Sequence, residues 1–135
     1  MNQQYSALTR LIDQVRTAQH ERTSLNICGG STKLFYGGTP TGEQLDMRSF
    51  SGISCHEPSE LVVTVRAGTL LSDLEATLAE QKQCLAFEPP RFGAPDAANE
   101  TAAGTVGGMV AAGLAGPARA NRADNAGLFA ALPAR

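Results

Sequence analysis

Hydrophobic positions at the start of the chain recur at the spacing of a helix. Between Ser6 and His20 they lie three or four residues apart, at Leu8, Leu11, Ile12, Val15 and Ala18. This spacing puts them on one side of an α-helix, because 3.6 residues complete a turn. Residues 6–20 are therefore predicted to form an amphipathic helix with one buried face.

Several short apolar segments that follow have the composition of strands. They are SLNIC (24–28), LDM (45–47), FSGIS (50–54, followed by the turn-prone HEPSE) and CLAFE (84–88, followed by Pro89 and Pro90). LVVTV, residues 61–65, is the clearest strand, because its β-branched residues suit a pleated, buried surface.

A second helix is predicted in LLSDLEATLAEQK, residues 70–82, where leucines at 70, 71, 74 and 78 share one face. Ser72 and Glu75 have the spacing of a capping box at its start. Helices thus alternate with strands, which predicts a mixed α and β domain.

Composition and charge narrow the function classes. The 135 residues fit one domain or part of a larger one, and 42% hydrophobic residues can supply a core. A net charge of −2 with scattered basic residues offers no field for nucleic acid. Three cysteines without metal-type spacing indicate reduced thiols and no metal site. Without a signal peptide or a membrane-spanning run, a soluble cytoplasmic protein is expected.

Residues 26–33, NICGGSTK, follow an apolar approach with two glycines, a serine, a threonine and a lysine. Glycine lets the backbone approach a ligand, and consecutive amides in such a turn can form an anion-binding nest, with Lys33 adding charge. The alternative is an ordinary turn that ends a strand and leaves Lys33 in solvent. The spacing matches neither a Walker loop nor the GxGxxG dinucleotide fingerprint.

A second glycine cluster, GTVGGMVAAGLAG, occupies residues 104–116. It could be a short helix whose glycines permit close contact with a flat or phosphorylated ligand. The alternative is tight helix packing through small residues. The apolar run is too short for a membrane helix.

The order of these segments resembles the FAD-binding domain of the vanillyl-alcohol-oxidase type, also called the PCMH-type domain. That family has a helix, a strand, a glycine-rich pyrophosphate loop, a VxAGxxLxxLxxxL unit and a later ATxGGxxAxGxxG segment. The matching segments here are NICGGSTK, VTVRAGTLLSDLEATLAEQ and GTVGGMVAAGLAGP. The segments LAFEPPRFG, LDMRSFSGIS and PSELVVTVRAGT point to a narrower group within this family. Their residues are similar to those of the FAD-binding subunits of bacterial glycolate oxidases. The resemblance covers about residues 5 to 118.

The resemblance implies an α+β fold, the N-terminal subdomain of a PCMH-type domain, with a small mixed sheet flanked by helices. It implies that the FAD pyrophosphate lies in a loop formed by Cys28, Gly29, Gly30, Ser31, Thr32 and Lys33. A second contact region would comprise Pro90, Gly104, Thr105, Gly107, Gly108 and Gly113, with Gly104 where the family usually has alanine. Neither His20 nor His56 matches a covalent-flavin motif, so FAD is expected to be non-covalent and both histidines to lie on the surface. No catalytic acid or base can be assigned.

The implied activity is the FAD-linked oxidation of glycolate, or another short 2-hydroxy acid, to its 2-oxo acid. It would take place in a complex with a second flavin subunit and an iron–sulfur subunit. Those partners could hold an otherwise cytoplasmic protein at the inner membrane.

The resemblance stops near Pro117. Residues 1–117 are expected to form the first FAD-binding subdomain, and 118–135 a divergent, poorly ordered tail whose Ala/Arg bias suggests a shifted reading frame or a premature end. The second subdomain and the substrate domain of the family are not in this sequence, so FAD binding is expected to be weak or absent. The alternative is a catalytically inactive fragment that acts as an interaction module through exposed apolar surface.

Overall fold

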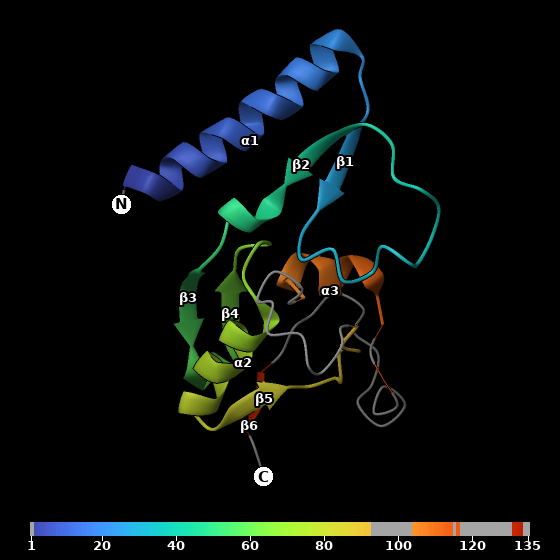
Figure 1. Ribbon diagram of the computed structural model, residues 1–135. Helices are drawn as coiled ribbons and strands as arrows, with labels where there is room; N and C mark the ends of the chain where they lie inside the picture. Colours follow the sequence, from blue (N-terminus) through green and yellow to red (C-terminus); the bar gives the residue numbers. More distant parts are fainter. Residues whose placement is uncertain (1, 93–103, 115, 117–130, 134–135) are drawn as a thin grey trace.

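A computed structural model describes residues 2–92, 104–114, 116 and 131–133 (Figure 1). The elements, in chain order, are α1 (Asn2–Glu21), β1 (Leu25–Cys28), β2 (Glu43–Asp46), the 3₁₀ turn η1 (Met47–Ser49), β3 (Ile53–Glu57), the 3₁₀ turn η2 (Pro58–Glu60), β4 (Val62–Val65), α2 (Leu71–Glu80), β5 (Gln83–Leu85), α3 (Val106–Ala112) and β6 (Ala131–Pro133). The α+β class expected from the sequence is confirmed. Most of the expected tail lies outside the described residues, although 131–133 pair with β5 as β6.

The N-terminal helix forms as predicted, but only part of its apolar face is buried. Leu11 is buried together with two alanines, whereas Leu8, Ile12 and Val15 remain 39–43% exposed. A helix of 20 residues is about 30 Å long, and the four-residue strands β1 and β2 beneath it extend only about 13 Å. This small sheet cannot cover the whole helix. Gln14 joins α1 to β2 by donating hydrogen bonds to Glu43 and to the Gln44 carbonyl.

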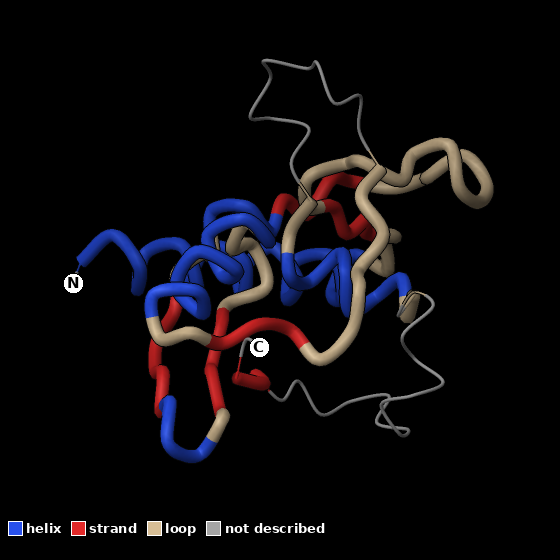
Figure 2. Tube along the Cα trace, turned by 90° about the horizontal axis from the view of Figure 1, so that it is seen from below, coloured by secondary structure: helices blue, strands red, loops and turns tan. Residues whose placement is uncertain are grey.

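The described strands pair two by two. β1 runs parallel to β2, with Leu25 opposite Glu43 and Cys28 opposite Asp46. β3 and β4 form an antiparallel hairpin around η2, visible at the lower left of Figure 2. β5 pairs with β6 in the antiparallel sense. The expected small sheet is thus divided into three two-stranded sheets within the described residues.

The strand predictions are wrong in several details, and β2 ends at Asp46 and β5 at Leu85, short of the predicted 45–47 and 84–88. The third strand covers 53–57 and not 50–54, because Phe50 closes the η1 turn and Gly52 adopts a φ of +111°. The LVVTV strand is only half-buried, with Val62 52% exposed, because the hairpin packs one of its faces on the core and leaves the other open.

The core lies between α2, α3 and β5. Its buried side chains come from the predicted leucine face of α2, from β5 and from α3: Leu71, Leu74, Leu78, Leu85, Val106 and Met109. The hairpin closes this cluster with Ile53, Val63 and Val65. α3 is therefore anchored in the hydrophobic core by one of its faces.

The predicted capping box does not form. α2 begins after Leu70, whose side chain makes no capping hydrogen bond. The amide of Leu71 instead donates to the carbonyl of Gly104 at 2.9 Å. The amide of Val106 donates to the carbonyl of Thr69, also at 2.9 Å. The start of α2 and the start of α3 thus satisfy each other's backbone groups, which fixes the second glycine segment in place.

Candidate functional site

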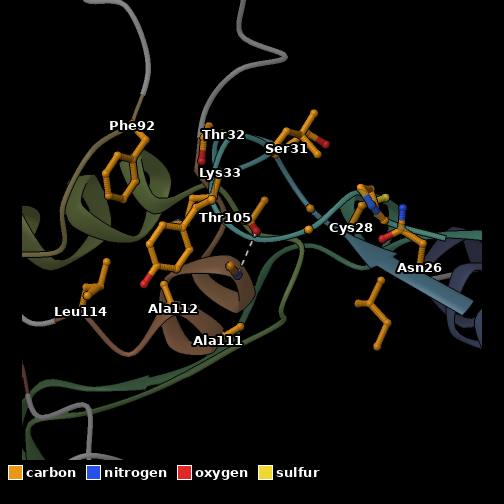
Figure 3. Close-up of a pocket in the computed structure, with 18 residues that line it drawn as sticks. Asn26, Cys28, Ser31, Thr32, Lys33, Phe92, Thr105, Ala111, Ala112 and Leu114 are labelled. Carbon is orange, nitrogen blue, oxygen red and sulfur yellow. Dashed lines mark hydrogen bonds between the residues drawn. The ribbon is translucent and has the colours of Figure 1, made fainter.

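The two glycine segments, 77 positions apart at Cys28 and Thr105, line one cleft with a volume of about 390 Å³ (Figure 3). The predicted contact residues that line it are Cys28, Gly29, Gly30, Ser31, Thr32, Lys33, Thr105 and Gly108. The loop after β1 forms one wall, and α3 forms the other. Convergence of the two segments was the geometry required by the sequence resemblance.

Gly29 on one wall lies directly against Thr105 on the other. A Cβ atom placed on Gly29 would lie 2.4 Å from the Thr105 hydroxyl oxygen, well inside van der Waals contact. Thr105 is 2% exposed, and its hydroxyl accepts a hydrogen bond from the Gly108 amide at 3.2 Å, drawn as the dashed line in Figure 3. The side chain that caps α3 is therefore also the surface on which the first glycine segment rests.

The backbone of the first segment has free donors beside the cleft. β1 ends at Cys28, and Ser31 adopts a left-handed conformation with φ +56°. Within the described part of the chain, the amides of Gly30, Ser31 and Thr32 donate to no protein group. Successive unpaired amides around a left-handed residue are a common way to bind an anion. The Cys28 thiol is instead held on β2, where it accepts a hydrogen bond from Gln44 at 2.9 Å.

The wall formed by α3 has small side chains on its cleft side. Gly108, Ala111 and Ala112 line the cleft, at the three- and four-residue spacing of one helix face. Val106 and Met109 lie in the core on the other side of the helix. Small residues on this face leave the cleft open for a ligand while the helix itself stays packed.

Four of the predicted contact residues do not line the cleft. The Gly104 carbonyl accepts a hydrogen bond from the first residue of α2, and the Gly107 amide donates to the carbonyl of Ala67, in the turn before α2, at 2.8 Å. Gly113 ends α3 with a φ of +62°. Pro90 lies half-buried in the loop after β5. Gly104, Gly107 and Gly113 therefore help to hold α3, the second wall of the cleft, in position.

Other lining residues were not foreseen from the sequence: Asn26, Ile27, Leu34, Tyr36, Gly38, Pro40, Phe92, Ala111, Ala112 and Leu114. One signal was present. The apolar triplet Leu34–Phe35–Tyr36 directly follows the glycine loop, a place where a solvent-facing turn would carry polar residues. Phe92 had no local signal, because it approaches the loop only through the fold.

Among the described residues that line the cleft, Lys33 alone carries a charged side chain. Its ammonium nitrogen lies 5.4 Å from the centre of the Phe92 ring. Arg91 pairs with Glu75 and does not line the cleft. A site with unpaired amides and a single cation favours an anionic ligand.

Among the other ionisable residues that the structure describes, Asp46, Arg48, His56 and His20 do not line the cleft. Arg48 donates hydrogen bonds to Asp46 and holds the pKa of that carboxyl below its usual value. His56 lies in β3, not in a turn, and its Nε2 is 2.8 Å from the buried Gln83 side chain. His20 is exposed near the end of α1.

The described residues hold neither a metal-binding cluster nor a membrane-spanning helix. They contain no group of three or more His, Cys, Asp and Glu side chains that could hold a metal ion. No helix among them is long and apolar enough to cross a bilayer.

Comparison with known proteins identifies the family. The family described as "FAD binding domain" matches residues 8–126, which is most of the chain. The protein therefore belongs to this FAD-binding domain family. Among curated proteins, the chain is similar to "Glycolate oxidase subunit GlcE" of Escherichia coli (strain K12), with 46% identity over 109 residues. That match covers 81% of this chain and 29% of the relative, so the chain spans less than a third of the relative's length. No solved structure matches the chain significantly.

Proposed function

We propose that the cleft between the β1 loop and α3 holds the diphosphate of FAD, and that the chain serves as FAD-binding part of a 2-hydroxy-acid oxidase. The observation that carries this proposal is the convergence of the two glycine segments, with Gly29 seated on Thr105. Family membership supports FAD as the ligand, and the similarity to a glycolate oxidase subunit supports glycolate as the substrate class.

Different residues of the cleft would contact FAD in different ways. The amides of Gly30, Ser31 and Thr32 would donate to diphosphate oxygens, and Lys33 would offset their charge. Gly108, Ala111 and Ala112 would let the ligand lie close to α3. Bound FAD would supply the hydride-accepting chemistry by which a 2-hydroxy acid becomes a 2-oxo acid. The protein's part is to position the cofactor and to limit its contact with water.

FAD binding by this chain is proposed to be non-covalent and weak. The described residues that line the cleft include no histidine, and the one cysteine among these described residues is hydrogen-bonded to β2. A cleft of about 390 Å³ is at the small end of ligand pockets, which usually bury most of their ligand. Part of a molecule as large as FAD would therefore stay in solvent, and its contacts must still offset the entropy of association.

A complex with other oxidase subunits is proposed on a separate observation. Leu8, Ile12 and Val15 lie at helical spacing on α1 and are exposed. Exposed apolar residues that share one helix face are typical of surfaces that meet another chain. An interaction module without catalytic activity is the alternative function that this surface favours, and FAD binding separates the two.

Titration of the purified chain with FAD, followed by flavin fluorescence, tests the proposal. We expect saturable binding with a dissociation constant between about 10 µM and 1 mM. Riboflavin, which lacks phosphate, should bind at least tenfold more weakly, because the amides and Lys33 would have no anion to hold. Acid precipitation should release all of the flavin. Equal affinity for FAD and riboflavin, or no binding at 1 mM FAD, would contradict diphosphate recognition and leave the interaction module.

A further inference from the structure

One wall of the cleft combines a cation with two aromatic rings. Lys33, Tyr36 and Phe92 all line the cleft. The Tyr36 amide donates to the Lys33 carbonyl at 2.9 Å, so residues 33–36 form a tight turn whose two ends are close together. Phe92 arrives from the segment after β5, and Figure 3 shows it on the Lys33 side of the cleft, away from Cys28 and Asn26.

Phe92 connects this turn to the rest of the fold. The Lys33 ammonium lies 5.4 Å from the centre of the Phe92 ring, which is within the range of a cation–π contact. Phe35 packs against the same ring with its centre 5.4 Å away and the planes inclined at 64°. The turn at residues 33–36 and the segment after β5 thus contact each other through the Phe92 ring.

The turn itself carries large apolar side chains into solvent. Leu34, Phe35 and Tyr36 are 65–73% exposed, although they follow one another directly. A contiguous exposed apolar patch on a binding cleft is typical of a surface that a ligand covers. Leu34 and Tyr36 line the cleft itself, so the ligand that would cover them is one bound there.

Occupation of the cleft by a diphosphate changes the balance at Lys33. A cation–π contact at an exposed site is weaker than a charge-assisted hydrogen bond to a phosphate oxygen. Lys33 gains by leaving the Phe92 ring for the anion, and the vacated ring face then lies beside the ligand.

We propose that Lys33 and Phe92 act as a paired specificity element. When a dinucleotide enters, Lys33 moves from the Phe92 ring to the diphosphate, and Phe92 stacks on a flat ring of the ligand. This inference rests on the proposed FAD function, because it takes the diphosphate site as given. The paired element explains why one wall of an anion site is aromatic. It would favour nucleotides over inorganic phosphates, because only nucleotides have a ring that can stack on Phe92. The flat ring is either the adenine or the isoalloxazine of FAD, which share this stacking chemistry.

Isothermal titration calorimetry with FAD, ADP, FMN and inorganic pyrophosphate tests the element. Phe92→Leu should weaken FAD binding by roughly 5- to 150-fold, the range for loss of one aromatic stacking partner. It should leave pyrophosphate binding unchanged, because the phosphate contacts remain. Lys33→Gln should weaken both ligands by roughly tenfold or more. If adenine is the stacked ring, Phe92→Leu weakens ADP and spares FMN; if isoalloxazine is stacked, the reverse holds.

The chain offers a matched control outside the cleft. The guanidinium of Arg66 lies over the Phe50 ring, also at 5.4 Å, and neither residue lines the cleft. Phe50→Leu and Arg66→Gln remove the same kind of contact and should leave all four affinities unchanged. Phe92→Tyr keeps the ring and should retain FAD binding, which separates loss of stacking from misfolding.

Each outcome bears on one of the two proposals. FAD binding by the wild-type chain that Phe92→Leu and Lys33→Gln both leave intact overturns the specificity element and keeps the FAD site. Equal weakening of FAD and pyrophosphate by Phe92→Leu also overturns it, since the ring would then support the phosphate site only. A wild-type chain that binds none of the four ligands overturns the proposed function, and the specificity element with it.

Discussion

Substitution of Gly29 by alanine tests whether the two glycine segments depend on each other. The new Cβ would lie 2.4 Å from the Thr105 hydroxyl oxygen, whereas ordinary contacts begin near 3.4 Å. The φ of Gly29 is not in the left-handed region, so the effect is one of space and not of backbone strain. The loop and α3 would have to separate by about 1 Å, the difference between these two distances.

The expected changes in the free energy of unfolding follow from the contacts of the Thr105 side chain. Overpacking of this kind costs about 1–3 kcal/mol. Thr105→Ala alone should cost about 1 kcal/mol, because the Gly108 amide loses its cap. The same change removes the two atoms nearest to the new Cβ, the hydroxyl oxygen and the Cγ2. In the double variant the alanine at 29 occupies the space that Thr105 has vacated. We therefore expect the double variant to be more stable than the sum of the two single changes by about 1 kcal/mol or more.

Urea unfolding followed by far-ultraviolet circular dichroism measures all four members of this cycle. Gly38→Ala is the control, because a Cβ there would meet no atom within 4 Å, and it should change the free energy of unfolding by less than about 0.5 kcal/mol. Strict additivity of Gly29→Ala and Thr105→Ala would refute the contact between the two walls. Gly29→Ala should also weaken FAD binding.

Two further predictions concern the frame around the site. Gly68→Ala places a Cβ 2.0 Å from the Met47 carbonyl oxygen, a backbone atom that cannot turn away, so we expect a loss of more than about 3 kcal/mol in the same unfolding assay; a neutral result would show that this turn is packed differently. For Asp46, the side-chain hydrogen bond from Arg48 lowers the folded-state pKa, so the pair's stabilisation is present above the unfolded pKa and disappears as the pH falls through the folded pKa. The stability advantage of wild type over Asp46→Asn should be under about 1 kcal/mol for this exposed pair and should shrink between about pH 5 and pH 3; an advantage that grows over this range would contradict the assigned direction.

Local sequence was sufficient for the elements whose packing is local. The leucines of α2 lie three and four residues apart, and Leu71, Leu74 and Leu78 supply half of the buried core residues. The α3 helix was predictable because Thr105 is a favourable cap and Gly113 a favourable end. The boundaries of the strands were predicted less accurately than those of the helices. The turns η1 and η2 contain residues whose composition is compatible with either a strand or a turn.

Long-range contacts explain the rest. Ser72 and Glu75 have the spacing of a capping box, but the Gly104 carbonyl satisfies the start of α2 from a distant part of the sequence. The roles of Gly104 and Gly107 in holding α3 cannot be predicted from the neighbouring sequence either, because their hydrogen-bond partners are distant in the chain. Convergence of the two glycine segments could be expected only from the family resemblance, and Phe92 only from the fold.

We propose that both glycine segments bind one diphosphate. Two-dimensional NMR of the ¹⁵N-labelled chain during titration with FAD tests it most directly. The amide signals of Gly30, Ser31 and Thr32 should shift together with that of Gly108, all with one dissociation constant. Shifts confined to a single segment, or centred elsewhere in the molecule, would contradict the shared diphosphate site.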